Sequence, residues 1–298
     1  MRPPDASAPS RCTHLVPAAL MLAACALIAA TTLIAKVLGS GAASGSELHP
    51  LQVTAGRFAF AFITLMPFIA WLRLDFAGTN WTNHVLRVVF GWAGVVCLFA
   101  AAGLMRLADV TAINFLNAIV AMFLANPLLG ERVGPWRWLG ATMAFAGAVT
   151  LIRPGTDAFQ PAALIVFLGA LFSGVEFVLI KSLSDREPPL RILFISNGLG
   201  SLVSVIAALF VWHWPLPHQW FLLAALGTTM VTVQALFIQA AQRADASYVT
   251  PFFYLTLVFA GLYDFVVFGV LPDLVGWLGA ALVAVGALVV VWRGQRRT

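Results

Sequence analysis

Residues 106–155 read RLADVTAINFLNAIVAMFLANPLLGERVGPWRWLGATMAFAGAVTLIRPG, and residues 242–294 read QRADASYVTPFFYLTLVFAGLYDFVVFGVLPDLVGWLGAALVAVGALVVVWRG. Both stretches pass through a short polar turn, an apolar run, a second turn, another apolar run and a basic stop. Asp109 matches Asp245 at a separation of 136 residues, and the WLGA segment at 138–141 returns at a separation of 139. A similarity of this length indicates an internal repeat, so the chain is predicted to consist of two halves.

The composition identifies the solvent of this chain. Hydrophobic residues make up 61% of the sequence and charged residues only 10%, whereas a soluble domain carries about 25% charged residues. Such a chain cannot cover its surface with polar groups, so we predict an all-α integral membrane protein in a lipid bilayer. The net charge of +5 is small for a protein that binds nucleic acid, and we expect no nucleic-acid partner.

Ten apolar segments are long enough to span a bilayer, which takes about 20 residues. They are 16–38, 50–72, 84–105, 109–129, 134–152, 162–182, 189–212, 218–240, 246–270 and 273–292. The connections are short, and no stretch remains that could form a soluble domain. We predict a disordered cytoplasmic tail at 1–15, a first five-helix repeat at 16–155 and a second at 156–298.

Lysine and arginine set the predicted orientation, because they accumulate on the cytoplasmic side of membrane proteins. With a cytoplasmic amino terminus, that side holds 13 of the 17 basic residues, Arg87 among them. Lys36, Arg57, Arg106 and Arg153 fall on the other side. This bias predicts that both termini are cytoplasmic.

The repeat also predicts a mechanism. Two copies of a unit with five helices must cross the bilayer in opposite directions, because five is an odd number. Inverted repeats of this kind are typical of transporters, whose halves can exchange conformations to give inward-open and outward-open states. A membrane-embedded enzyme has no need of this arrangement.

Several short motifs follow one another along the chain: AKVL at 35–38, Arg57, LLGERVG at 128–134, WLG at 138–140, AG at 146–147 and RPG at 153–155. In these motifs the sequence resembles the EamA-type branch of the drug/metabolite transporter superfamily. The resemblance implies a ten-helix bacterial inner-membrane permease with a central cavity between its halves. Related carriers move amino acids, sugars, riboflavin, S-adenosylmethionine or amino-acid-derived metallophores, many of them outward. The fourth span has Asn117-Ala118 where a proline is expected nearby, so the sequence does not predict the standard helix break there.

Three ionisable residues inside the predicted spans are candidates for the substrate or coupling site: Glu176, Asp264 and Arg57. An ionisable side chain in the bilayer costs about 2.5–3.5 kcal/mol, so its presence indicates a function. Glu176 and Asp264 could face the cavity, where they would pair with a cationic substrate group or take up a proton. The alternative is a structural ion pair with Arg57, Lys36 or Lys181.

Polar side chains extend this candidate site. Asn114 and Asn117 share one face of the fourth span, and Thr250 and Tyr254 share one face of the ninth. Amides and hydroxyls can orient a zwitterionic solute, but they can equally form hydrogen bonds between helices. Gly147 and Gly279 are predicted to permit close helix packing instead.

The predicted function is a secondary transporter of a small polar metabolite, with export as the expected direction. The sequence contains no catalytic constellation, no metal-binding motif and no phosphate-binding loop, so we expect no cofactor and a gradient, most simply of protons, as the energy source. The two acids favour a cationic or zwitterionic solute such as an amino-acid derivative or a metallophore. Alternatives are an uptake carrier for a vitamin or nucleoside-type metabolite, a lipid flippase, or a membrane-embedded enzyme. The carrier is expected to be a monomer or a homodimer.

Overall fold

The computed structural model describes residues 12–42, 46–72, 76, 78–129, 135–152, 160–184, 187–241, 255–270 and 272–294. Within these ranges every regular element is a helix, which confirms the prediction of an all-α membrane protein. Six helices are long and apolar enough to cross a bilayer, and four shorter apolar helices occupy the remaining predicted spans. Of the predicted tail at 1–15, only residues 12–15 are described, and they belong to the first helix.

The helices follow the predicted spans except at the fourth and ninth. Their bounds are α1 Cys12–Gly39, α2 Pro50–Leu72, α3 Trp81–Ala102, α4 Leu107–Asn114, α5 Leu116–Leu129, α6 Pro135–Ile152, α7 Ala162–Ser184, α8 Pro189–Leu209, α9 Pro217–Ala241, α11 Leu255–Phe268 and α12 Leu274–Gly294. Proline opens four of them, because the N–H that it lacks would have no partner in a first helical turn. The ninth span, predicted at 246–270, is described only from residue 255.

The fourth span consists of two helices, separated by a break that the sequence did not predict. α4 ends at Asn114 and α5 begins at Leu116. Between them, the Phe115 N–H is shared by the carbonyls of Thr111 and Ala112, each at 3.2 Å. The ψ angle of Phe115 is −12°, well away from the value of about −42° in a regular α-helix. A tightened turn therefore interrupts the span without a proline.

Large apolar side chains cover the outside of the bundle. Phe210, Phe221 and Leu274 are 86%, 74% and 76% exposed, respectively. Surfaces of this kind are stable only in contact with lipid, where helix backbones satisfy their own hydrogen bonds.

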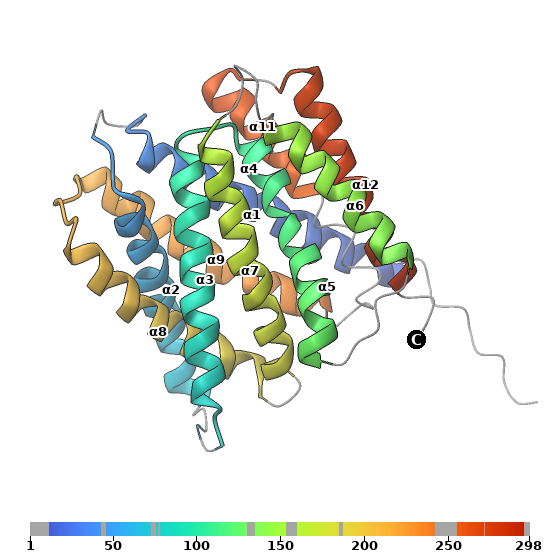
Figure 1. The fold of residues 1–298 in the computed structure, drawn as a ribbon. Helices are drawn as coiled ribbons and strands as arrows, with labels where there is room; N and C mark the ends of the chain where they lie inside the picture. The colour runs from blue at the N-terminus through green and yellow to red at the C-terminus, as the bar shows by residue number, and fades with distance from the viewer. Residues whose placement is uncertain are drawn as a thin grey trace, which may run out of the picture.

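The most extensive helix–helix contacts join the first repeat to the second. α3 packs against α7, α1 against α9, α2 against α8 and α6 against α12. Figure 1 shows α3 beside α7 and α6 beside α12. Exchanging the two repeats converts the α3–α7 pair into the α9–α1 pair and leaves the α2–α8 and α6–α12 pairs unchanged. This is the pattern that a pseudo-two-fold axis between the repeats requires.

The α6–α12 pair depends on two glycines, as predicted. A Cβ atom on Gly147 would lie 2.7 Å from the carbonyl oxygen of Gly279, and a Cβ atom on Gly279 would lie 3.1 Å from that of Gly147. Only glycine allows backbones to approach this closely, and small residues are the usual means of packing helices in membranes.

The connections between helices gather at two opposite faces of the bundle. At the first face, Gln219 donates a hydrogen bond to the carbonyl of Ser46 at 2.9 Å, and Arg106 pairs with Asp273 at 3.2 Å. At the second face, Glu187 accepts a hydrogen bond from the Asn80 N–H at 3.0 Å. Successive helices cross the bilayer in opposite directions, so every second connection lies on the same side. Each of these contacts joins two connections that lie on the same side by this rule. We call these the first face and the second face.

Candidate functional site

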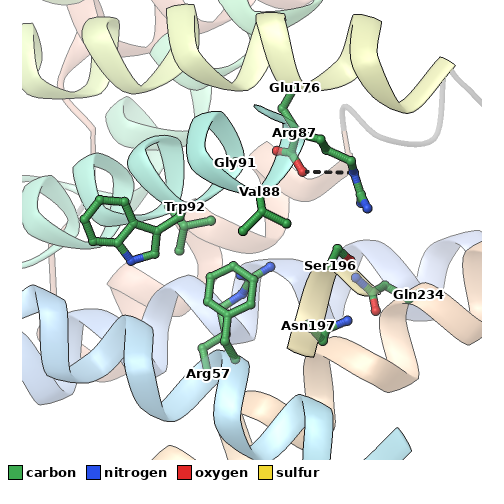
Figure 2. Close-up of a pocket in the computed structure, with 11 residues that line it drawn as sticks. Arg57, Arg87, Val88, Gly91, Trp92, Glu176, Ser196, Asn197 and Gln234 are labelled. Atoms are coloured by element: carbon green, nitrogen blue, oxygen red, sulfur yellow. Dashed lines mark ion pairs between the residues drawn. The ribbon is translucent and has the colours of Figure 1, made fainter. Parts of the chain in front are cut away.

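A cavity of about 50 Å³ lies between the two repeats. α2 and α3 line it from the first repeat, and α7, α8 and α9 line it from the second. Its polar lining residues are Arg57, Arg87, Trp92, Glu176, Ser196, Asn197 and Gln234 (Figure 2). The volume is that of about three or four water molecules, whereas ligand pockets usually measure about 300–1,000 Å³. The cavity must therefore widen before it can hold a metabolite.

Glu176 enters the cavity from α7 and rests on α3. A Cβ atom on Gly91 would come within 2.5 Å of the Glu176 carboxyl carbon, so Gly91 provides the space that this carboxylate occupies. The Nε atom of Arg87 lies 3.7 Å from Glu176 Oε1 (Figure 2). This separation is an ion pair but exceeds the limit of about 3.2 Å for a direct hydrogen bond. Arg87 thus places a positive charge beside Glu176 but does not fix the Glu176 oxygens by a direct hydrogen bond.

Arg57 enters the cavity from α2 and is only 9% exposed. Its guanidinium carbon lies 4.5 Å from the centre of the Phe58 ring, a cation–π contact. Among the described residues, no carboxylate lies within ion-pair distance of Arg57. Glu176 lines the same cavity and attracts Arg57 electrostatically, but the two side chains form no direct ion pair.

Arg87 lines the same cavity, although the sequence analysis counted it among the cations of the cytoplasmic side. Its residue exposure is 6%, and its Nη1 atom donates a hydrogen bond to the carbonyl of Ile192 at 3.2 Å. That bond joins α3 to α8, so Arg87 connects the two repeats.

Four polar atoms of the cavity residues are buried and have no hydrogen-bond partner in the described structure. Three are donors, namely Arg57 Nη1, Arg87 Nε and Trp92 Nε1, and one is an acceptor, Gln234 Oε1. A buried polar atom without a partner costs about 1–3 kcal/mol. A bound solute that presents oxygen atoms to these donors would recover that free energy.

Asp264 occupies a different place from Glu176. Its carboxylate accepts a hydrogen bond from Lys36 Nζ at 2.6 Å and another from the Leu107 N–H, at the beginning of α4. The Asp264 residue is 1% exposed, and it is not among the residues that line the cavity. Lys36 also lies 4.4 Å from the centre of the Phe268 ring. This geometry is that of a structural ion pair between Asp264 and Lys36, which the sequence left open as the alternative to a role in the cavity.

The remaining predicted site residues lie apart from the cavity or outside the described residues. Asn114 and Asn117 flank the break at Phe115, are half-buried and do not line the cavity. The Asn117 carbonyl lies 2.9 Å from where a Cβ atom on Gly174 would stand, so this turn packs on α7. Thr250 and Tyr254 are outside the described residues, as is the side chain of Lys181.

The sequence analysis missed five polar residues of the cavity: Arg87, Trp92, Ser196, Asn197 and Gln234. The repeat carried a signal for Ser196. Pro50-Leu51 recurs as Pro189-Leu190, and the same separation of 139 residues leads from Arg57 to Ser196. Two equivalent positions of the repeats therefore meet at this cavity. Among the described residues there is no group of three histidine, cysteine or acidic side chains that could hold a metal ion.

The fold and the cavity define a class of protein. An all-helical membrane bundle, made of two repeats around a polar cavity that both repeats line, is the architecture of a membrane transporter. The family is also clear: the chain belongs to the EamA-like transporter family, whose model matches residues 16–153 and again 160–292.

Several relatives are similar over most of their length. The S-adenosylmethionine uptake transporter of Rickettsia prowazekii is 26% identical over 85% of this chain and 86% of its own. The riboflavin transporter of Rhizobium johnstonii is 32% identical over 81% of this chain and 80% of its own. A crystal structure with 19% identity superposes with a TM-score of 0.60 over 96% of this chain and 100% of its own, which supports the fold. The chain is thus a multi-pass membrane transporter of small molecules.

Proposed function

We propose that this chain is a secondary transporter that moves an amino-acid-like or amino-acid-derived metabolite across the bacterial inner membrane by alternating access. The observation that carries this proposal is the cavity shared by the two repeats, with its buried polar atoms that have no partner. Such atoms are costly in a membrane bundle unless they serve a ligand. Export is the proposed direction, with both termini in the cytoplasm.

The two faces of the bundle support alternating access. The first face is held by the Gln219–Ser46 and Arg106–Asp273 contacts, and the second by contacts of Glu187 with Asn80 and His84. A carrier must open one face at a time, and near-symmetric repeats make the two open states similar in energy. Glu176 is the proposed coupling residue, with a proton as the coupling ion.

An uptake carrier is the second candidate, because relatives of this chain are named as an uptake transporter for S-adenosylmethionine and as transporters for riboflavin. S-adenosylmethionine carries an amino-acid group, which suits the first proposal chemically. Direction depends on the gradients of substrate and coupling ion, since inverted repeats are nearly symmetric.

A comparative metabolite profile tests the function. Cells and medium are compared among the deletion strain alone, the same strain carrying the wild-type gene, one carrying Glu176→Gln, and one carrying Glu47→Gln. Glu47 is an exposed carboxylate in a connection, so its variant is a control for the same chemical change. Export predicts a compound enriched in the medium and depleted in the cells for the wild type and Glu47→Gln only.

Each other outcome has a definite meaning. The opposite distribution of the compound would establish uptake. A chemically altered compound on both sides of the membrane would contradict transport and support an enzyme. Equal profiles in all strains, despite equal amounts of protein in the membrane, would contradict the proposed function.

A further inference from the structure

The charges around the cavity do not cancel. Arg57 and Arg87 contribute two positive charges and Glu176 one negative charge. Arg87 and Glu176 form an ion pair with each other at 3.7 Å. Arg57 is left with no carboxylate within ion-pair distance among the described residues, although it is only 9% exposed. The one acid, Glu176, cannot neutralise both arginines, and a buried charge that is not neutralised is unfavourable, so this position favours a ligand that supplies a negative charge.

Three of the four cavity atoms without hydrogen-bond partners indicate the same kind of ligand, and the fourth, Gln234 Oε1, is an acceptor. The three donors without partners, on Arg57, Arg87 and Trp92, all belong to the first repeat. A guanidinium group is a planar donor that suits a carboxylate, and the indole N–H can only donate. Together these groups can bind oxygen atoms but cannot bind an ammonium group.

We propose that Arg57 is the binding site for a carboxylate group of the transported solute, with Arg87 and Trp92 as further donors. This inference deepens the proposed function and rests on it. One excess positive charge matches one carboxylate, whereas a phosphate dianion would leave a net negative charge in the bilayer. Glu176 is available for an ammonium group on the same solute, but the Arg57 subsite does not require one. The carboxylate is therefore essential for recognition and the amino group is not.

This subsite narrows the preference that the sequence suggested. A cationic or zwitterionic solute was expected because Glu176 and Asp264 were both candidates for the cavity. Asp264 is instead paired with Lys36 and does not line the cavity. With two arginines and one acid, the cavity favours the anionic end of a zwitterion over a purely cationic amine.

Three matched sets of compounds test this subsite with purified full-length carrier in detergent. The first set is the proteinogenic L-amino acids, the second their decarboxylated amines, and the third their analogues with the carboxylate but without the amino group. Binding is measured from the rise in unfolding temperature with compound concentration, because a ligand stabilises the folded state to which it binds. We expect at least one amino acid to bind, its matched amine to bind at least tenfold more weakly, and its carboxylate analogue to retain binding.

Variants at Arg57 identify the subsite. Arg57→Gln should weaken binding of the carboxylate compounds by about ten- to a hundredfold, the loss of a charge-assisted hydrogen bond. It should also remove the difference between the amino acid and its amine, which a mere loss of folded protein would not do. Arg57→Lys keeps the charge but not the planar donor pair, so it should restore part of the difference. Glu47→Gln, which removes an exposed charge in a connection away from the cavity, is the control.

The outcomes are decisive. Equal binding of an amino acid and its matched amine by the wild type would overturn the inference, as would a panel in which no carboxylate compound binds. A preference for carboxylates that survives Arg57→Gln would also overturn it. A metabolite profile that shows transport alongside any of these results would leave the proposed function standing, whereas a profile without transport would contradict that function itself.

Discussion

Two acids lie within the membrane-spanning helices, and their surroundings differ. The Asp264 carboxylate accepts hydrogen bonds from Lys36 and from the first N–H of α4, and it is almost completely buried. The Glu176 carboxylate lies in a cavity, beside an arginine at 3.7 Å and among donors that have no partner. The two acids looked equivalent in the sequence. We propose that the hydrogen-bond partners of an intramembrane acid, rather than its presence, indicate whether it holds the fold together or serves a ligand.

The largest effect that separates the two acids is expected at Asp264. Asp264→Asn leaves the buried Lys36 ammonium without its counter-ion, and breaking a buried pair costs about 3–5 kcal/mol. The free energy of unfolding in detergent, measured by denaturant titration, should fall by that amount. The double variant with Lys36→Gln should recover part of the loss. An Asp264→Asn carrier with normal stability and abolished transport would mean that the two acids act alike.

Glu176→Gln should have the opposite profile. We expect transport to fall by about ten- to a hundredfold, because this change removes a charged group from the proposed site. The free energy of unfolding should fall by less than in Asp264→Asn, since the Glu176 carboxylate makes no direct hydrogen bond with Arg87, although Arg87 loses its counter-ion. Transport in proteoliposomes at several pH values, with denaturant titration in parallel, measures both. Unchanged transport and unchanged pH dependence would make Glu176 structural as well.

Gly91→Ala tests the position of the Glu176 carboxylate without changing any charge. The new methyl group would meet the carboxyl carbon at 2.5 Å, so the carboxylate must move, and transport should fall by about tenfold. Gly39→Ala is the matched control, because a Cβ atom there has no neighbour within 4 Å. Equal transport by the two variants would show that the exact position of Glu176 does not matter.

The smallest effect is expected at Glu187, an acid outside the spans. Burial raises the pKa of Glu187, but hydrogen bonds from His84 and from the Asn80 N–H, with the charges of His84 and Arg191, lower it further, so its pKa lies below the usual value. An acid with a lowered pKa stabilises the folded state at pH values above its unfolded-state pKa, which is about 4.3 for glutamate. This stabilisation is lost as the pH falls through the folded-state pKa.

The free energy of unfolding of the wild type should therefore decline below about pH 4. In Glu187→Gln this decline should be smaller, by less than about 1 kcal/mol. Transport near neutral pH should change less than in Glu176→Gln, because Glu187 lies outside the cavity and contributes only contacts with Asn80 and His84 at the second face. Unfolding temperatures of both proteins across the acid range measure the first effect, and uptake by proteoliposomes the second. A loss of transport comparable to that of Glu176→Gln would contradict the distinction between paired and unpaired acids.

Hydrophobicity made most of the fold predictable, because each span needs about 20 apolar residues and the connections are polar. The break at Phe115 was not predictable in the same way, since it follows from shared hydrogen bonds and packing rather than from a proline. Arg57 and Glu176 stood out as charges deep within apolar runs. Arg87 did not, because a cation near the beginning of a helix reads as an interfacial residue.

The partner of Asp264 could not be chosen from sequence either. Lys36 is 228 residues away, and three cations were equally plausible partners. Amide and indole groups such as Gln234 and Trp92 carry no charge and so attract no attention in an apolar run. Their importance depends on the partners that they lack, which only a three-dimensional arrangement reveals.

The way the repeats pack has a consequence for how the protein is made. The most extensive described contacts of α1, α2, α3 and α6 are with helices of the second repeat. During synthesis the first five spans therefore enter the membrane well before their packing partners leave the ribosome. Each must persist as an independent helix in lipid until then, as the two-stage view of membrane folding allows. Nascent chains that stop after the first repeat should be long-lived clients of membrane quality control.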